Sequence, residues 1–382
     1  MLIHRTLLES LKKSKKSFLL LGPRQTGKST LIKELSPEVS INLANEQTYL
    51  DFAKNPKELE ERLASKKIKT VFIDEVQRLP SLLNTLQDLL DNSDSPPRFY
   101  LTGSSARKLK RGGANLLPGR IHTYRLGPLA SSELDYQLST KVAMETGLLP
   151  GIYTESSPEE KIKTLRSYSG TYLKEEIQAE ALTKNLEGFS RFLFVIAQAS
   201  GHFLDLAKLS SEAAISRQSA QRFFEILEDT LLVHRVSAFS KSEWKRLIQH
   251  PKFYFFDTGV LNALLGNFHA SDDRKGLLFE NLFHSQLIAS AYARDLEIRV
   301  SSYRTEHGAE VDFIVEIERK IWAIELKASR NVGASDLTGL KSFATFLGKT
   351  HHPVVAYLGD VEKKIEGIDI LPWQTLLQWM GL

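Results

Sequence analysis

The amino-acid sequence predicts an α/β protein built from three domains. Short apolar runs alternate with helical segments through the first third, which is typical of a parallel sheet covered by helices. The segment from residue 161 to residue 268 is mostly helical, and strands return after residue 276. We therefore expect a parallel-sheet domain at 1–160, a helical domain at 161–268 and a second α/β domain at 269–382.

The composition is that of an ordinary globular chain. Of the 382 residues, 42% are hydrophobic and 25% are charged, so each domain can bury a core. The net charge of +4 permits contact with nucleic acid without indicating it. Cysteine is absent from the sequence, which excludes disulfides and thiolate metal sites. The sequence also lacks a signal-peptide core and a membrane-spanning run, so we expect a cytoplasmic protein with no membrane partner.

Strands and helices of the first domain can be predicted from apolar runs and from the capping and turn residues between them. Ser81 is expected to cap a helix whose leucines form an apolar stripe. The expected strands are 17–21, 39–44, 69–74 and 98–104, and the expected helices are 29–35, 59–64 and 81–90.

The loop between the first strand and the first helix matches G-x-x-x-x-G-K-[ST]. In such a P-loop, backbone N–H groups and the helix N-terminus converge on phosphate oxygens. Lys28 would reach the β- and γ-phosphates, and Ser29 would hold Mg²⁺. We therefore expect ATP and Mg²⁺ as ligands. The expected nucleotide-binding residues are Gly22, Pro23, Arg24, Gln25, Thr26, Gly27, Lys28, Ser29 and Thr30.

Two acids follow the apolar run Val71-Phe72-Ile73. Strand ends in a parallel sheet point into the ligand crevice. Asp74 would position Mg²⁺ and its waters, and Glu75 would be the general base that polarises the attacking water. The alternative is a solvated pair of acids in a loop.

The next strand ends in hydroxyl residues and is followed by a basic segment. Thr102 would sense the γ-phosphate or hold the lytic water, with Ser104 the second choice; simple turn chemistry is the alternative. Arg120, after Gly119, would stabilise transition-state charge in cis or across an oligomer interface, unless it is an ordinary surface arginine. Possible anion contacts or solvated loop charges are Arg107, Lys108, Lys110 and Arg111.

Together these motifs resemble a prokaryotic family of AAA-type ATPases with a C-terminal region labelled as a domain of unknown function. The motifs that carry the resemblance are Gly22–Ser29, Phe72–Pro80, Leu101–Ser105, Gly119-Arg120, Leu126–Leu129, Gly147–Pro150 and Lys252–Gly259. The resemblance extends over most of the chain and implies a P-loop NTPase domain of AAA type with the roles assigned above. A separate second sensor arginine is not evident in the sequence.

The middle domain contains a helix, turn, helix and strand pattern typical of a winged helix. We expect helices at 203–212 and 217–229, the second capped by Ser216, and a strand at 231–236. DNA would be contacted by Arg217, Gln218, Gln221 and Arg222. A helical module that contacts only protein is the alternative.

The last domain carries acids and a lysine on three neighbouring elements. Glu280 lies on an expected helix at 276–283 and Asp312 on an expected strand at 308–315. Glu325 and Lys327 share one face of a strand at 321–327. This pattern resembles the PD-(D/E)xK nuclease fold. In that interpretation Asp312 and Glu325 hold Mg²⁺, Glu280 belongs to the catalytic set, and Lys327 activates water. An exposed surface pattern is the alternative.

The first hypothesis for function is a Mg²⁺-dependent ATPase coupled to DNA binding or processing through the nuclease-like domain. The second is a nucleotide-gated switch whose nuclease-like domain binds without cutting. The third is a protein-remodelling ATPase. Expected partners are ATP and DNA, with a second copy of the chain or another protein as further candidates.

Overall fold

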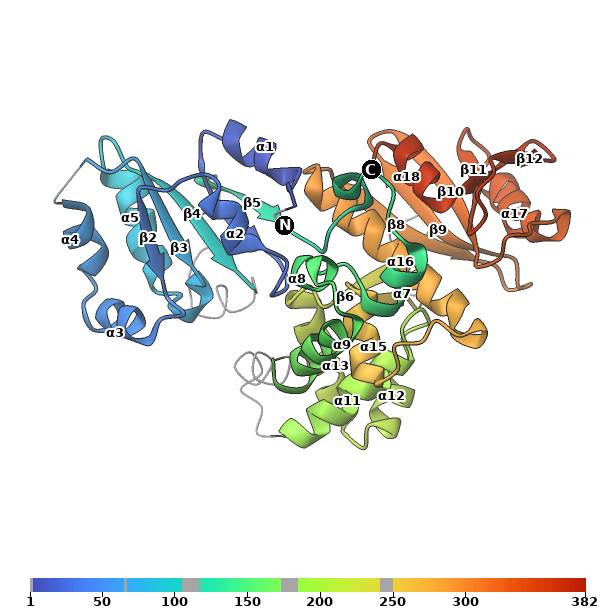
Figure 1. The fold of residues 1–382 in the computed structure, drawn as a ribbon, viewed down its shortest axis with the longest axis horizontal. Coiled ribbons are helices and arrows are strands. Elements are labelled where there is room, and N and C mark those ends of the chain that lie inside the picture. Colours follow the sequence, from blue (N-terminus) through green and yellow to red (C-terminus); the bar gives the residue numbers. More distant parts are fainter. Residues whose placement is uncertain (1–2, 65–66, 105–116, 118, 173–184, 241–249) are drawn as a thin grey trace.

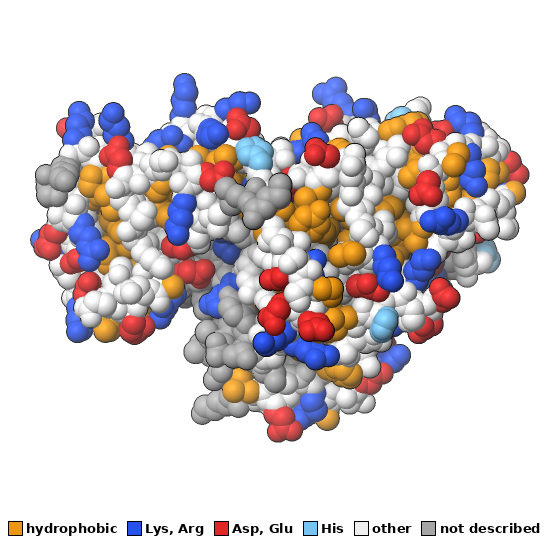
Figure 2. Space-filling view, viewed as in Figure 1, with side chains coloured by type: hydrophobic (Ala, Val, Ile, Leu, Met, Phe, Trp, Pro, Cys, Tyr) orange, Lys and Arg blue, Asp and Glu red, His pale blue; other side chains and the backbone are white. Residues whose placement is uncertain are grey.

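The structure of the chain is a computed structural model that describes residues 3–64, 67–104, 117, 119–172, 185–240 and 250–382 (Figure 1). Two sheets lie at opposite ends of the long axis of the molecule, and a group of helices lies between and below them in this view. Among the described residues, no helix is long and apolar enough to cross a membrane. Acidic and basic side chains are interspersed over the face shown in Figure 2.

The first sheet is parallel, as the alternation of strands and helices predicts. Its order is β2-β3-β4-β1-β5, and every neighbouring pair runs parallel. The strands are β1 (Ser17–Leu21), β2 (Val39–Asn42), β3 (Thr70–Asp74), β4 (Arg98–Gly103) and β5 (Ile121–Arg125). All of β1 is buried because helices cover both faces of the sheet. The carboxyl ends of β1, β3 and β4 therefore meet at one edge.

The three helices expected in this region are present with shifted ends, and three further short helices were not predicted from sequence. They are α1 (Leu7–Lys13), α2 (Lys28–Lys33), α3 (Glu46–Lys54), α4 (Glu58–Ala64), the short η1 (Val76–Arg78) and α5 (Leu82–Asn92). The prediction that Ser81 caps α5 with its side chain is wrong. Ser81 already has helical backbone angles, and the first N–H groups of α5 are satisfied by the carbonyls of Leu79 and Pro80.

A helical region follows, and it begins before residue 161. Its elements are η2 (Ser131–Leu134), α7 (Thr140–Thr146), α8 (Pro150–Thr154), α9 (Pro158–Ser167), η3 (Tyr168–Tyr172), α11 (Leu186–Gln198), α12 (Leu206–Glu212), α13 (Arg217–Asp229) and α15 (Thr258–Leu265). Helix α7 packs on α15, where Asn262 Nδ2 donates to the carbonyl of Met144 at 2.9 Å.

Two of the sequence motifs, at 147–150 and at 252–259, meet at this packing contact. Asp257 Oδ2 accepts the N–H of Leu148 at 2.7 Å, and Oδ1 accepts the N–H of Val260 at 3.0 Å as the cap of α15. A Cβ on Gly147 would lie 2.1 Å from Asp257 Oδ1. Glycine is therefore required at 147 for the two segments to approach.

The two helices expected in the middle domain are present, but the first is shorter than predicted. Asp205 caps α12, and residue 203 lies outside the helix. Phe203 instead forms an antiparallel bridge with Lys252, because the segment after Gly201 pairs with residues 251–253 through backbone bonds. The predicted cap of α13 is confirmed, since Ser216 Oγ accepts the N–H of Ser219 at 3.1 Å.

The second sheet has eight strands in the order β12-β13-β11-β10-β9-β8-β6-β7. They are β6 (Val233–Ala238), β7 (Lys252–Phe255), β8 (Ile298–Arg304), β9 (Glu310–Ile317), β10 (Lys320–Lys327), β11 (His352–Tyr357), β12 (Lys363–Ile365) and β13 (Ile368–Pro372). The accompanying helices are α16 (Asp272–Ala293), η4 (Ala334–Leu337), α17 (Thr338–Leu347) and α18 (Trp373–Met380). Because β6 and β7 precede residue 269, the sheet extends across the expected boundary at 268/269. The division at 160 and 268 stays a prediction.

The centre of this sheet is covered by α16 on one face and by α17 on the other. Phe279 and Phe283 of α16 pack in one core with Phe313 of β9. Leu340 and Phe343 of α17 belong to a separate core with residues from β9, β10 and β11. The result is a three-layer arrangement in which α16 lies directly over β9 and β10.

Candidate functional site

The P-loop leaves β1 and enters α2 through backbone conformations that a glycine-bounded loop permits. Gly27 has a φ of 90°, and Gln25 also lies in the left-handed region, with a φ of 60°. A Cβ on Gly22 would lie 2.2 Å from the carbonyl oxygen of Leu126, at the end of β5. Glycine is therefore needed at 22 for the loop to pass this close to the neighbouring strand.

Lys28 and Ser29 sit at the first turn of α2. Lys28 is 5% exposed, and its Nζ donates to the carbonyls of Gly22 at 2.8 Å and Pro23 at 2.9 Å. Ser29 Oγ donates to Asp74 Oδ1 at 3.0 Å. A serine hydroxyl and a carboxylate are hard oxygen donors of the kind that Mg²⁺ prefers, so these two side chains fit a magnesium ion.

Glu75 and Thr102 are brought together with Asp74 at the same sheet edge. The Thr102 hydroxyl donates to Asp74 Oδ1 and accepts the backbone N–H of Glu75 at 3.2 Å. Glu75 has a φ of 60°, a sparsely populated conformation for a glutamate. Four residues predicted from sequence thus form one polar group: Ser29 at the start of α2, Asp74 and Glu75 at the end of β3, and Thr102 near the end of β4.

Gln77 also belongs to this group, although it was not predicted from sequence as a site residue. It is 4% exposed, and its Nε2 donates to Glu75 Oε2 and to Ser104 Oγ at 3.0 Å. Gln77 therefore connects the proposed base to Ser104, the second-choice sensor. A polar residue among the apolar neighbours Val76 and Leu79 was the available signal.

A cavity of about 520 Å³ opens beside these residues. It is lined by Arg24, Gln25, Gly27, Lys28, Ser29, Thr30, Ala44, Glu75 and Arg78. Arg78 was also missed from sequence. Its guanidinium donates to the carbonyl of Ala44 at 2.8 Å, forms an ion pair with Glu46 at 3.2 Å and lies 5.2 Å from the centre of the Tyr49 ring.

Arg120 is not brought to the P-loop within this chain. It precedes Ile121, which pairs with Ser17 at the amino end of β1, whereas the P-loop follows the carboxyl end. The guanidinium forms two bonds with Asp91, at 2.5 and 2.7 Å, and the bonding from Arg120 lowers the pKa of the Asp91 carboxyl. The predicted cis contact is therefore not formed here. Arg107, Lys108, Lys110 and Arg111 lie outside the described residues.

The side chain of Arg5 binds the backbone of the P-loop. Its Nη1 donates to the carbonyl of Thr26 at 2.6 Å, and Nη2 donates to Gly127 and Pro128 at 3.0 and 3.1 Å. Its Nε forms an ion pair with the buried Glu133 at 3.0 Å. The P-loop is thereby tied to the segment that leaves β5.

A second polar group lies where β9 and β10 separate. The antiparallel register ends at Phe313 and Ile324, so Asp312 and Glu325 are the next residues on each strand. Leu326 N–H donates to Asp312 Oδ2 at 2.7 Å in place of a ladder bond. On the other side, Asp312 and Phe313 together oppose Ser302 of β8, which is a β-bulge. Bulges re-aim side chains, often next to active sites.

Glu280 joins this group from α16 through a lysine and a tyrosine. Lys252 Nζ forms ion pairs with Glu280 at 3.2 Å and with Glu310 at 2.7 Å. The Tyr254 hydroxyl also donates to Glu280 Oε1. Lys252 and Tyr254 lie on β7, and neither was predicted from sequence to take part in a site. We call Lys252, Glu280, Glu310, Asp312, Glu325 and Lys327 the carboxylate cluster.

The charges of the carboxylate cluster act on one another. Burial raises the pKa of Asp312 well above its usual range, and the neighbouring Glu325 and Glu280 raise it further. Burial also raises the pKa of Glu325, although Lys327 Nζ at 3.0 Å works against this. Burial alone would lower the pKa of Lys252, but Glu280 and Glu310 outweigh it, so the pKa is raised and the lysine is firmly charged.

A divalent cation would find two carboxylates here, those of Asp312 and Glu325. Within the described part of the chain, no group of three or more histidine or acidic side chains is arranged to hold a metal ion. Lys327 contacts Glu325 and, at 3.4 Å, Asp336. The donor chemistry suits Mg²⁺, whose remaining positions are commonly filled by water or substrate oxygens.

The side chains predicted to contact DNA lie together on α13. Arg217, Gln218, Gln221 and Arg222 are exposed on the first turns of α13. Gln221 Nε2 donates to Glu225 at 2.9 Å. The structure places them on one helix as expected, and their contact with DNA stays a prediction.

Comparison with known proteins supports an AAA-type ATPase domain in the first part of the chain. Residues 14–135 match the family model described as an AAA domain. Residues 139–271 and 275–376 match two models, each described as a domain of unknown function (DUF8612 and DUF4143). The AAA-type first domain and the C-terminal region of unknown function agree with the resemblance drawn from sequence.

Two curated proteins are similar to the chain in sequence, and two solved structures match it only weakly. The uncharacterized proteins Mb2031c of Mycobacterium bovis and Rv2008c of Mycobacterium tuberculosis are each 27% identical, over 81% of this chain and 69% of theirs. The Bacillus subtilis DNA clamp loader delta protein (YqeN) is 13% identical at a TM-score of 0.24, over 74% of this chain and 98% of its own. Protein VC1899 from Vibrio cholerae is 12% identical at a TM-score of 0.22, and the match covers 96% of this chain and 98% of that protein. Scores this low carry no argument about this fold.

Proposed function

We propose that the protein hydrolyses ATP with Mg²⁺ at the P-loop and couples hydrolysis to DNA binding or processing at the carboxylate cluster. The observation that carries the ATPase proposal is the contact of Ser29, Asp74, Thr102 and Glu75 at one sheet edge beside the P-loop cavity. These are the oxygen ligands, the base and the sensing hydroxyl that phosphoryl transfer to water requires.

Each residue has a defined task in this proposal. Lys28 exchanges the carbonyls of Gly22 and Pro23 for the β- and γ-phosphates when nucleotide enters. Ser29 and Asp74 would hold Mg²⁺, which neutralises phosphate charge. Glu75 accepts the proton of the attacking water, while Thr102 fixes its backbone and Gln77 fixes its carboxylate.

Coupling between the two sites has a continuous structural basis in α16. Gln286 of this helix is fully buried; its Nε2 donates to the carbonyl of Leu129 at 3.0 Å, and its Oε1 accepts the N–H of Ser131 at 2.7 Å. The same segment is bound to the P-loop by Arg5. Glu280 lies less than two turns earlier on α16. A shift of the P-loop would therefore act on the helix that carries Glu280.

At the carboxylate cluster we propose metal-assisted cleavage of a phosphodiester. Asp312 and Glu325 would hold Mg²⁺, Lys327 would orient the attacking water or steady the developing charge, and Glu280 would tune Asp312 by its charge. The strand order and the helices α16 and α17 on opposite faces support a nuclease-like domain. A winged-helix role for α13 and the β6–β7 pair would supply further DNA contact.

A silent cluster is the second candidate, and the ion pairs of Lys252 favour it. Lys252 already neutralises Glu280 and Glu310, and burial disfavours the charged form of Asp312. In that case the protein is a nucleotide-gated switch or a remodelling ATPase that binds DNA or protein without cutting.

Side-by-side ATPase and nuclease assays separate these proposals. Wild type and Asp312→Ala are given ATP and Mg²⁺ with single-stranded, duplex and branched DNA. Two results together support the first proposal: DNA stimulates ATP hydrolysis, and DNA cleavage is present in wild type but lost in Asp312→Ala. ATPase without DNA stimulation or cleavage supports the second. Absence of ATP hydrolysis under all conditions overturns the ATPase assignment. Repeating the ATPase assay across protein concentrations tests a trans role for Arg120.

A further inference from the structure

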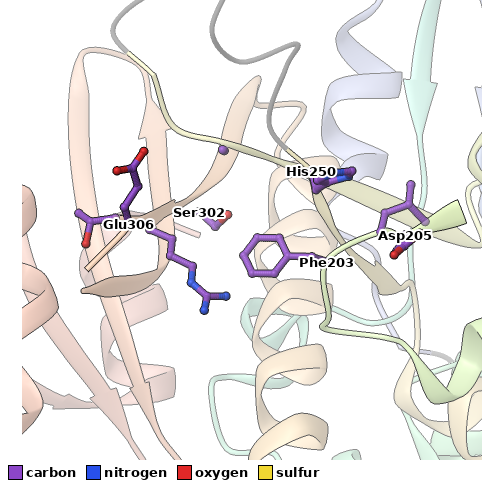
Figure 3. A pocket seen from close by; sticks show the side chains of 9 residues that line it. Phe203, Asp205, His250, Ser302 and Glu306 are labelled. Atoms are coloured by element: carbon purple, nitrogen blue, oxygen red, sulfur yellow. The ribbon is translucent and has the colours of Figure 1, made fainter. Parts of the chain in front are cut away.

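A cavity lies close to the carboxylate cluster. It has a volume of about 570 Å³, within the range of small-ligand sites. Its walls come from the segment before α12, from the ends of β6 and β8 and from the residues that follow β8. Figure 3 places Phe203 between Ser302 and Glu306 on one side and His250 and Asp205 on the other.

Phe203 is a fixed aromatic surface in this cavity. Its backbone forms a bridge with Lys252, and the flanking residues bond to the same strand through Gly201 N–H to Phe253 at 2.8 Å and Leu204 N–H to Pro251 at 2.7 Å. The backbone that carries the ring is therefore held by main-chain bonds on both sides. It remains partly exposed to the cavity.

Two cations border this ring and reach the carboxylate cluster. The Arg304 guanidinium lies 5.2 Å from the ring centre, and Lys252 Nζ lies 5.7 Å from it. Lys252 pairs with Glu310, and Arg304 Nε lies 3.8 Å from Glu310. The side chain of Arg304 is half exposed, so a ligand in the cavity can reach its guanidinium. Two residues that line the cavity, Phe203 and Arg304, thus lie next to members of the carboxylate cluster.

The acids of the cavity decide which part of a ligand it can take. Asp205 and Glu306 would repel a phosphate, whereas carboxylate oxygens accept hydrogen bonds from the amino groups of a base. The ring and the guanidinium plane supply surfaces on which a flat heterocycle stacks. An unpaired base would lie on Phe203, and its phosphate would face the exposed Arg304.

We propose that this cavity binds one unpaired nucleobase of a single nucleic-acid strand and so aligns the strand with Asp312 and Glu325. The inference rests on the proposed nucleic-acid role of the carboxylate cluster and names its substrate class. Phe203 is the stacking residue, and Arg304 is the contact to the adjoining phosphate.

The test is binding of a short single-stranded oligonucleotide that contains 2-aminopurine, measured with the full chain in EDTA so that cleavage cannot occur. Phe203→Leu keeps an apolar side chain without a π-face, and Phe203→Trp keeps the face. Base–aromatic stacking predicts a loss of about fivefold or more for Phe203→Leu and no loss for Phe203→Trp. DNA and RNA versions identify the nucleic acid, and binding of either supports the proposal.

An abasic strand of equal length is the control for stacking. We expect it to bind wild type and Phe203→Leu equally, and circular dichroism melting verifies that both variants are folded. Equal affinity of wild type and Phe203→Leu for the normal strand would overturn the base pocket alone. If wild type binds no strand at all, the nucleic-acid role of the carboxylate cluster falls as well, and the ATPase proposal stands on its separate assay.

Discussion

The hydroxyl of Ser29 donates to Asp74 Oδ1 across 3.0 Å, although 45 positions separate the two residues. The contact exists because β1 and β3 run parallel on either side of β4, so their carboxyl ends face the same crevice. Thr102, at the end of β4, donates to the same carboxylate oxygen. One carboxylate oxygen of Asp74, at the end of β3, thus accepts hydrogen bonds from the end of the P-loop and from β4.

Glu75→Gln should retain ATP binding and lose hydrolysis. The amide keeps the size and hydrogen bonding of the side chain but cannot accept a proton, and loss of a general base costs about 10²- to 10⁴-fold in turnover. Nucleotide binding by equilibrium dialysis and phosphate release measure the two properties. Glu60→Gln, an exposed change on α4, is the matched control. Normal turnover in Glu75→Gln would assign the base to another residue.

Arg78→Ala should lower kcat/KM for ATP by about tenfold or more, the typical value of a charge-assisted bond to phosphate. Arg78 lines the cavity that holds Lys28 and Glu75, whereas Arg120 is bonded to Asp91 at the opposite sheet edge. Arg120→Ala is therefore the matched comparison. An effect of Arg120→Ala that appears only at high protein concentration would indicate action across an interface. A silent Arg78→Ala would remove Arg78 from the nucleotide site.

Asp312→Ala should abolish Mg²⁺-dependent cleavage of DNA and leave ATP hydrolysis unchanged. Asp312 belongs to the carboxylate cluster, and it also accepts the N–H of Leu326, so thermal melting must accompany the assay. Asp360→Ala, at an exposed acid, is the control. Equal cutting by wild type and Asp312→Ala would place the activity at another site or in a contaminant.

The site residues that could be predicted from sequence are those that belong to contiguous motifs. Lys28, Ser29, Asp74 and Glu75 each stand at the end of a recognisable strand or the start of a helix, so parallel-sheet geometry brings them together. Lys252 could not be found in this way, because its partner Glu280 is 28 positions away on another element. The bulge at Asp312 and the bridge at Phe203 likewise depend on strand pairing that local patterns do not encode.

Asp257→Ala should lower the free energy of unfolding by about 2–4 kcal/mol. The change removes the cap of α15 and leaves the buried N–H of Leu148 without its acceptor. Urea denaturation measures the loss. Asp205→Ala removes an exposed cap from α12 and should cost only about 1 kcal/mol. Equal losses for the two variants would mean that the contact between the 147–150 and 252–259 segments adds no stability.

His234 should make the protein less stable as the pH falls below about 6.5. Its ring lies 5.9 Å from His284 and 6.3 Å from Tyr292, and its burial, reinforced by the charge of Arg125, lowers its pKa to about 4. In the unfolded chain the ring binds a proton near its ordinary pKa of 6.5. Between these two values the unfolded state holds more protons, so acid favours unfolding, and the full stability is present above 6.5.

Replacement of the His234 ring tests whether acid destabilises the folded protein through this residue. His234→Phe keeps an aromatic side chain and removes the proton site, so the slope of unfolding free energy against pH should decrease by up to about 1 kcal/mol per pH unit between pH 6 and 4.5. His307→Phe, at an exposed turn, should leave the slope unchanged. Burial also lowers the pKa of His284, so part of the slope should persist in His234→Phe. Urea titrations at several pH values measure it, and a slope equal to that of wild type would show that His234 is protonated in the folded protein.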